Sequence, residues 1–168
     1  MPALILLRHG KSDWRADYGG DDRARPLARR GRKAARTIGR FLARTGQVPD
    51  VAITSPALRA EETLRLAMAA GDWTCPARSA EALYGGGVAR LLSEIHNEPT
   101  ATGVLLAVGH EPTWSEAVAL LIGGGRLRLP TGALARIELE VDRWEDVGPG
   151  SGVLAWSVAP RLLGRLGC

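Results

Sequence analysis

Short runs of apolar residues recur along the chain and are separated by longer segments of mixed polarity. The apolar runs cover residues 4–7, 51–54 and 104–108, and each has the length and composition of a strand that is buried on both faces. Two more segments with strand composition cover residues 133–141 and 153–159. Continuous apolar strands of the first kind are typical of a parallel sheet covered by helices.

The segments between the strands have helical periodicity or helix-start signals. Apolar residues recur at helical spacing over about residues 27–44. A second helix is predicted over residues 55–70, where the initial Ser-Pro pair would supply the N-cap and the first helical residue. Helices are also expected over residues 88–96 and 112–122, whereas residues 71–80 are irregular and contain at most a short strand.

The alternation of strands and helices predicts an α/β fold. We expect a three-layer α/β/α arrangement, in which helices cover both faces of a mainly parallel central sheet of about six strands. The chain has 168 residues, 45% of them hydrophobic and 24% charged, which fits a single folded domain over residues 1–168 and excludes a disordered or fibrous chain. In such sheets ligands bind beyond the carboxyl ends of the strands.

Targeting and redox signals are few. No apolar stretch is long enough for a membrane helix, and the first residues lack the basic segment of a secretory signal. We therefore expect a cytoplasmic protein with no membrane partner. Cys75 and Cys168 are far apart in the sequence, so neither a disulfide framework nor a cysteine metal site is expected.

The chain is basic, with 22 Lys and Arg against 18 Asp and Glu and a net charge of +4. Nine of the basic residues fall between positions 23 and 44, where apolar residues recur at helical spacing, so we place them on a solvated helix face. The one aromatic residue among them, Phe41, belongs to the apolar positions, so no aromatic residue accompanies the basic ones on the solvated face to stack on bases. We therefore expect no nucleic-acid partner, although a basic module that binds polyanions remains an alternative.

Polar residues follow three of the predicted strands. Arg8 and His9 come directly after the first apolar run, Arg59 lies just beyond the second, and His110 follows the third. The strand-end rule predicts that these side chains meet at one edge of the sheet. Taken singly, each has an ordinary structural explanation, but together they favour a functional site.

Two histidines and two arginines suit a phosphoryl group. The planar guanidinium groups of Arg8 and Arg59 can each bind two phosphate oxygens, and a neutral His9 ring can attack phosphorus. His110 would donate to an oxygen on which charge builds, and Gly10 would let the backbone turn sharply and leave room for the substrate. The histidines lack the spacing of metal ligands, so no metal site is predicted.

Three sequence blocks carry a family resemblance. The blocks are LLRHGKSDW at residues 6–14, TSPALRAEETL at residues 54–64 and VGHEPTW at residues 108–114. They resemble, in order, the signatures of the histidine phosphatase superfamily, also called phosphoglycerate mutase-like. The short interval between the second and third blocks resembles the SixA-type phosphohistidine phosphatases, because the mutases have a longer insertion there.

The resemblance implies roles for individual residues. His9 would be the nucleophile that becomes phosphorylated, and the phosphate pocket would consist of Arg8, Arg59 and His110. Lys11 and Ser12 occupy positions that line the pocket in relatives, and no metal or organic cofactor is implied. Trp14 and Trp114 adjoin the blocks, but tryptophans in such places more often pack against the core, so no role is assigned to them.

The proton donor to the leaving group is less clear, because larger relatives supply a glutamate from their insertion. Glu81 is the best candidate here, followed by Asp13 and Glu111, although Glu81 fits an exposed residue before a helix equally well. A phosphoramidate P–N bond needs such an acid less than an ester does. We therefore expect a phosphatase for protein phosphohistidine. The alternatives are a phosphatase for a small phosphate ester, such as a sugar phosphate or nucleotide, and the non-catalytic basic module, which would have no use for a nucleophile.

Overall fold

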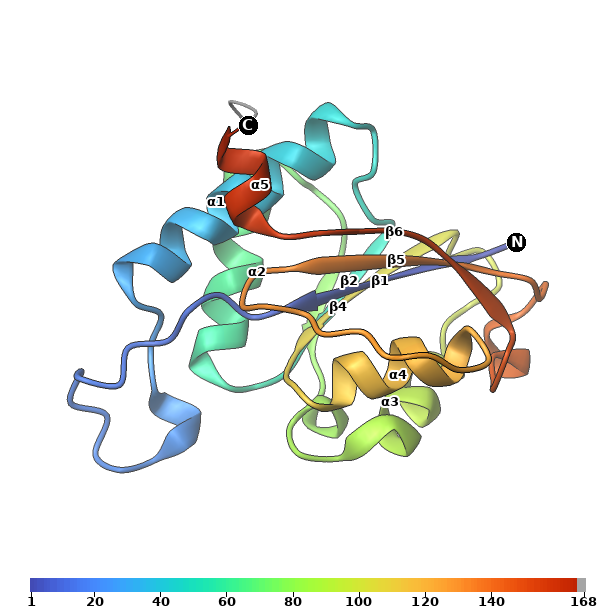
Figure 1. The fold of residues 1–168 in the computed structure, drawn as a ribbon, viewed down its shortest axis with the longest axis horizontal. Coiled ribbons are helices and arrows are strands. Elements are labelled where there is room, and N and C mark those ends of the chain that lie inside the picture. Colours follow the sequence, from blue (N-terminus) through green and yellow to red (C-terminus); the bar gives the residue numbers. More distant parts are fainter. Residues whose placement is uncertain (166–168) are drawn as a thin grey trace.

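The computed structural model describes residues 1–165 and has three α/β/α layers (Figure 1). Within these residues six strands form one sheet in the order β3-β2-β4-β1-β5-β6. The strands are β1 (Ala3–Arg8), β2 (Val51–Thr54), β3 (Ala77–Ser79), β4 (Val104–Gly109), β5 (Leu134–Leu139) and β6 (Gly152–Val158). Strands β1 to β4 run parallel, whereas β5 pairs antiparallel with β1 and β6. The mainly parallel six-stranded sheet predicted from the sequence is confirmed.

Helices cover both faces of the sheet, as Figure 1 shows. One layer contains α1 (Arg29–Arg44), α2 (Leu58–Gly71) and α5 (Pro160–Arg165), and the other contains α3 (Gly87–Ile95) and α4 (Thr113–Leu121). Short 3-10 helices are η1 (Asp22–Ala24), η2 (Glu81–Leu83) and η3 (Trp144–Asp146). Alternate residues of β1 face opposite layers: Leu4 and Leu6 join one hydrophobic core, Ile5 and Leu7 the other. This explains why the strand is apolar without interruption.

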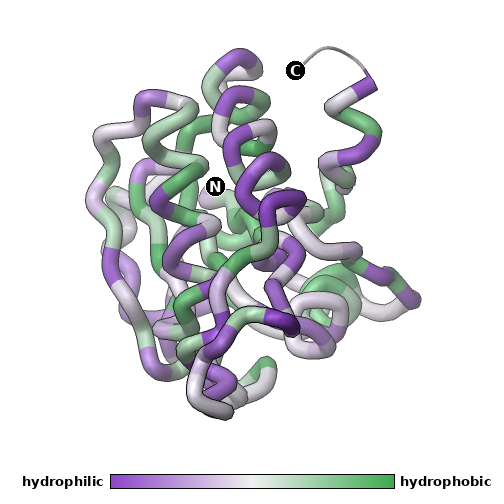
Figure 2. The backbone as a smooth tube through the Cα atoms, turned by 90° about the vertical axis from the view of Figure 1, so that its left-hand side faces the viewer, coloured by the Kyte–Doolittle hydropathy of each residue, from purple (hydrophilic) through white to green (hydrophobic). Residues whose placement is uncertain are grey.

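The exposed face of α1 carries its basic residues. Gly31, Ala35, Ile38 and Leu42 are buried, whereas its arginines lie at exposed or half-buried positions. Figure 2 shows hydrophilic and hydrophobic residues alternating along the helical turns. The solvated face predicted for this segment is confirmed for the basic residues of α1, but the prediction is wrong for Arg25, which precedes the helix and is buried. No helix within residues 1–165 has the length and apolar character needed to cross a membrane.

The predicted start of α2 is wrong. Ser55 and Pro56 precede the helix, which begins at Leu58 with Ala57 as its N-cap. The Ser55 hydroxyl accepts a hydrogen bond from the Ala57 backbone N–H at 3.3 Å, so it forms a local turn before the helix instead of capping it. The turn leaves Ser55 buried at the end of β2, where its hydroxyl is available to another element.

A close contact fixes the loop after β1 against the first turns of α1. A Cβ atom added to Gly31 would lie 2.2 Å from the Lys11 carbonyl oxygen, and one added to Gly10 would lie 2.8 Å from the Gly31 oxygen. The Ala28 N–H also donates to the Lys11 oxygen at 2.8 Å. Only glycines permit this approach of two backbones, and it holds the residues that follow β1 in place.

Candidate active site

His9 lies at the carboxyl end of β1 and is 8% exposed. Its Nδ1 is 2.7 Å from the Gly10 carbonyl oxygen. Because a carbonyl oxygen only accepts, Nδ1 must carry the proton, and in the neutral ring Nε2 keeps its lone pair. Burial, together with the nearby charges of His110, Arg59 and Arg8, lowers the pKa of His9 to about 3. The ring is therefore neutral at physiological pH and keeps a lone pair on Nε2.

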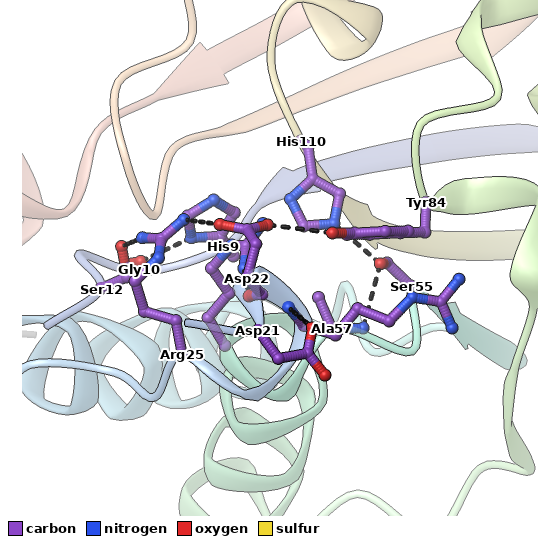
Figure 3. A network of polar contacts seen from close by, with 12 residues as sticks. His9, Gly10, Ser12, Asp21, Asp22, Arg25, Ser55, Ala57, Tyr84 and His110 are labelled. Carbon is purple, nitrogen blue, oxygen red and sulfur yellow. Dashed lines mark hydrogen bonds and ion pairs between the residues drawn. The ribbon is translucent and has the colours of Figure 1, made fainter. Parts of the chain in front are cut away.

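His110 follows β4 and faces His9 (Figure 3). The two ring centroids are 5.1 Å apart, and the His110 Nε2 lies 2.7 Å from the Ser55 hydroxyl oxygen. Burial and the charge of Arg59 lower the pKa of His110 to about 4. The structure thus brings the ends of β1, β2 and β4 together, as the strand-end rule predicts.

Buried arginines surround the histidine pair. Arg8 donates from Nη1 to the Leu129 carbonyl oxygen at 2.8 Å, and Arg59, on α2, is 5% exposed. Within residues 1–165 the buried Nε–H groups of Arg8, Arg25 and Arg59 have no hydrogen-bond partner. Buried donors of charged groups are normally satisfied, because leaving one unpaired costs about 1–3 kcal/mol. Three such groups around one site are suited to an oxyanion ligand.

Asp22 occupies the space between these cations, and sequence analysis did not single it out. Its carboxylate accepts hydrogen bonds from Arg25 at 2.7 Å, Arg59 at 2.9 Å and the Tyr84 hydroxyl at 3.0 Å. Figure 3 shows it between Arg25 on one side and Tyr84 on the other, close to His110. Burial alone would raise the pKa of Asp22, but these hydrogen bonds outweigh it and hold the pKa far below its usual range.

Arg25 is the second residue that sequence analysis missed. It is 5% exposed, donates to the Ser12 hydroxyl and lies 3.6 Å from the centre of the Trp14 ring. Its neighbours in the sequence are surface arginines, and composition cannot tell a buried guanidinium from an exposed one. The signal that could have indicated its burial is the Pro26-Leu27 pair that follows it in the sequence. Leu27 is buried and anchors this end of the loop.

The loop residues predicted to line the pocket have different surroundings. The Gly10 N–H donates to the Thr63 hydroxyl at 3.0 Å, and that hydroxyl donates to the Arg59 carbonyl oxygen at 2.7 Å. Thr63 therefore ties the loop after β1 to α2. Ser12 is buried beside Arg25, whereas the Lys11 side chain is exposed.

Within residues 1–165, none of the three candidate proton donors is hydrogen-bonded to His9 or His110. Glu81 is bound by Arg23 at 2.7 and 3.1 Å, has a side chain that is 68% exposed, and has its pKa lowered by this hydrogen bond. Asp13 accepts from the Arg15 N–H, and Glu111 accepts from the Ser115 hydroxyl. The Arg23 guanidinium stacks 4.5 Å from the centre of the Tyr84 ring, which links Glu81 to the site indirectly.

The two tryptophans near the sequence blocks differ in burial. Trp114 is fully buried, donates from its ring N–H to the Leu7 carbonyl oxygen at 3.0 Å and packs against Gly109. It is a core residue, as tryptophans in such places more often are. Trp14 is 62% exposed and covers the outer face of Arg25.

Comparison with known proteins identifies the family. Residues 4–85 match the histidine phosphatase superfamily (branch 1). The protein Rv1276c of Mycobacterium tuberculosis is 34% identical over 165 residues, which span 92% of this chain and 100% of that protein. The chain belongs to the histidine phosphatase superfamily.

Solved structures narrow the assignment to one branch. SixA from Nakamurella multipartitia has a TM-score of 0.81 and 26% identity, covering 95% of this chain and 96% of that one. The protein histidine phosphatase SixA in complex with tungstate has a TM-score of 0.81 and 25% identity, covering 96% and 99%. The SixA-type resemblance of the three sequence blocks is confirmed. The chain is therefore a phosphatase of the SixA-type branch and takes a phosphorylated substrate.

Proposed function

We propose that the chain removes phosphate from protein phosphohistidine, with His9 as the nucleophile. The observation that carries this proposal is the pairing of a neutral, buried His9, whose Nε2 lone pair is free, with three unsatisfied guanidinium N–H groups. Together they supply a nucleophile and a binding place for a phosphoryl group. The SixA structure with tungstate, a tetrahedral oxyanion, supports the same use of this fold.

The reaction has two displacement steps at phosphorus. In the first, the His9 Nε2 lone pair forms a bond to phosphorus while the P–N bond of the substrate breaks. The substrate ring carries a proton on its other nitrogen, so the electron pair leaves with a neutral imidazole. In the second, water attacks phosphorus, the His9–P bond breaks, and the proton released from water passes to solvent. Arg8, Arg59 and His110 hold the oxygens on which charge builds in both steps.

Asp22 must give way to the substrate. Its carboxylate and the phosphoryl oxygens would compete for Arg59 and Arg25, and two anions at one pair of cations repel each other. The phosphoryl group carries more negative charge than a carboxylate, so it would replace Asp22 on the arginines. The loop that carries Asp22 would then move outward, which opens the site.

The proposed substrate class depends on whether the leaving group must take a proton from an acidic side chain. Glu81 and Asp22 both have lowered pKa values and are carboxylates at neutral pH, which makes them weak proton donors. A phosphohistidine ring that is protonated at its other nitrogen leaves as neutral imidazole, whose conjugate acid has a pKa near 6.5, and needs no further proton, whereas an alkoxide must be protonated as it departs. Glu81 remains the donor that the sequence predicts, and its exposure and ion pair favour phosphohistidine over esters.

A substrate comparison tests the proposal. The rate of phosphate release from a histidine-phosphorylated protein would be compared with that from a panel of sugar phosphates and nucleotides, using wild type and His9→Ala. We expect phosphohistidine to be the best substrate by at least about tenfold in kcat/KM and His9→Ala to abolish all turnover. A metabolite ester hydrolysed faster than phosphohistidine would establish the small-ester alternative instead.

A further inference from the structure

A second pocket lies next to the candidate active site, on the side of β5 and β6. It has a volume of about 440 Å³ and lies between α1, α5 and the segment before β5. Lys11, two residues after His9, lines it, and so does Thr131, whose neighbour Gly132 donates to the carbonyl oxygens of Arg8 and His9. The pocket therefore shares its wall with the loop that holds the nucleophile, but it contains neither histidine of the site.

The charge of this pocket is one-sided. Four basic side chains line it, from Lys11, Arg30, Lys33 and Arg161, and among the described residues its lining contains no acidic side chain. Within residues 1–165 none of the four forms an ion pair, although six other arginines of this part of the chain do. Uncompensated cations around a concave surface concentrate positive potential there. An anion is the ligand that this arrangement would bind.

The size and the lining of the pocket exclude a bare phosphate as a matching ligand. Small organic ligands occupy pockets of about 300–1,000 Å³, and a single tetrahedral ion would leave most of this volume to water. Between the basic side chains the lining is apolar, with Ala34, Pro130 and Pro160, and Thr37 adds a hydroxyl. Proline and alanine surfaces accept a flat ring, while lysine and arginine bind phosphoryl oxygens.

We propose that this pocket binds a phosphorylated small molecule with a flat aromatic ring, of the nucleoside diphosphate class, independently of the phosphoryl group at His9. Phosphoryl oxygens would contact Arg30, Lys33 and Arg161, and the ring would lie against the prolines. The site is distinct from the phosphatase centre because its lining does not include Arg8, His9, Arg59 or His110.

Calorimetric titration with ADP tests the proposal on the full chain. Arg30→Ala/Lys33→Ala removes two lining cations from exposed helix positions, where alanine preserves the helix. Arg36→Ala/Arg40→Ala removes the same charge from exposed positions of the same helix outside the pocket and serves as the control. We expect the first variant to weaken ADP binding by at least about tenfold and the second to change it by less than about twofold.

Two further measurements separate this site from the phosphatase centre. Arg59→Ala should leave ADP affinity within about twofold, and Arg30→Ala/Lys33→Ala should retain wild-type turnover of a small chromogenic phosphate ester. Equal losses of ADP affinity in both double variants would show only a diffuse charge effect. Loss of binding in Arg59→Ala would place ADP at the phosphatase centre. If the wild-type chain does not bind ADP and Arg30→Ala/Lys33→Ala turns over a phosphoprotein more slowly, an acidic protein segment docks in the pocket instead. Each of these three results overturns the proposal.

Discussion

Asp22 and Arg59 form an ion pair in the middle of the candidate phosphate pocket, with 2.9 Å between the Asp22 Oδ2 and the Arg59 Nη2. The other terminal nitrogen of Arg59 donates to the Asp22 backbone carbonyl at 2.7 Å, so one residue occupies both ends of the guanidinium. The guanidinium proposed to bind phosphate is therefore already bound to a carboxylate of its own chain. If Arg59 binds phosphate as proposed, this arrangement makes Asp22 a competitor of the substrate.

Asp22→Asn should strengthen oxyanion binding. Removing the negative charge leaves Arg59 and Arg25 without their internal anion, and we expect the inhibition constant for tungstate to fall by about three- to tenfold. Asp17→Asn is the matched control, since it removes the same charge from the same loop, where the Asp17 carboxylate accepts a hydrogen bond from the Gly19 N–H. Weaker tungstate inhibition in Asp22→Asn would show instead that Asp22 holds the arginines in position.

Arg25→Lys should impair catalysis although it keeps the charge. A lysine cannot contact Ser12, Asp22 and a phosphoryl oxygen at once, nor can it stack on Trp14 as a guanidinium does. We expect kcat/KM to fall by about tenfold or more while the melting temperature stays within a few degrees. Arg29→Lys, at an exposed position of α1, is the control. Unchanged kcat/KM would remove Arg25 from the site.

Stability should fall as the pH is lowered from about 7 to 4.5. The folded pKa values of His9 and His110 are about 3 and 4, both below the ordinary value near 6.5, so in this range the unfolded chain binds more protons than the folded one. Each histidine can contribute a loss of up to about 1.4 kcal/mol per pH unit. The lowered pKa of Asp22 acts only below this window, where its stabilising contribution is lost near pH 4 and under.

Urea unfolding at several pH values measures this effect. The charges facing the two rings come from Arg8, Arg25, Arg59 and Asp22, and they remain in His110→Gln. That variant should show a shallower decline of unfolding free energy with falling pH than wild type. Identical slopes for the two proteins would contradict the buried, neutral state of His110.

Glu81→Gln separates the two substrate classes. Hydrolysis of phosphohistidine should stay within about threefold of wild type, because its leaving group needs little protonation. Ester hydrolysis should fall by about 10²-fold if Glu81 acts as the donor that the sequence predicts. Equal losses on both substrates would point to a structural role of its ion pair with Arg23, and an unchanged ester rate would exclude Glu81 as the acid.

The sheet and the histidine pair could be predicted from the sequence because the signals are local. A strand buried on both faces is a continuous apolar run, and the strand-end rule then places Arg8, His9 and His110 at one edge. Asp22 and Arg25 escaped prediction because their role depends on how a glycine- and aspartate-rich loop folds back over the site. No periodicity encodes such a path.

Helix boundaries were predicted less well for a different reason. The Ser55-Pro56 pair has the composition of a helix start, yet the Ser55 hydroxyl forms a turn and contacts His110 at the end of the neighbouring strand β4. A tertiary contact thus competes with the local capping preference. The described part of α5 covers six residues, Pro160–Arg165, too few for a periodic pattern to reveal.

The central claim is that His9 Nε2 accepts the phosphoryl group. It is tested most directly by quenching the wild-type enzyme during turnover of a histidine-phosphorylated protein and mapping phosphate on its peptides by mass spectrometry under alkaline conditions. We predict an acid-labile phosphoryl group on the peptide containing His9, absent from His9→Ala and more abundant when the second step is slowed. Turnover by His9→Ala, or a phosphoryl group found only on another residue, would contradict the account.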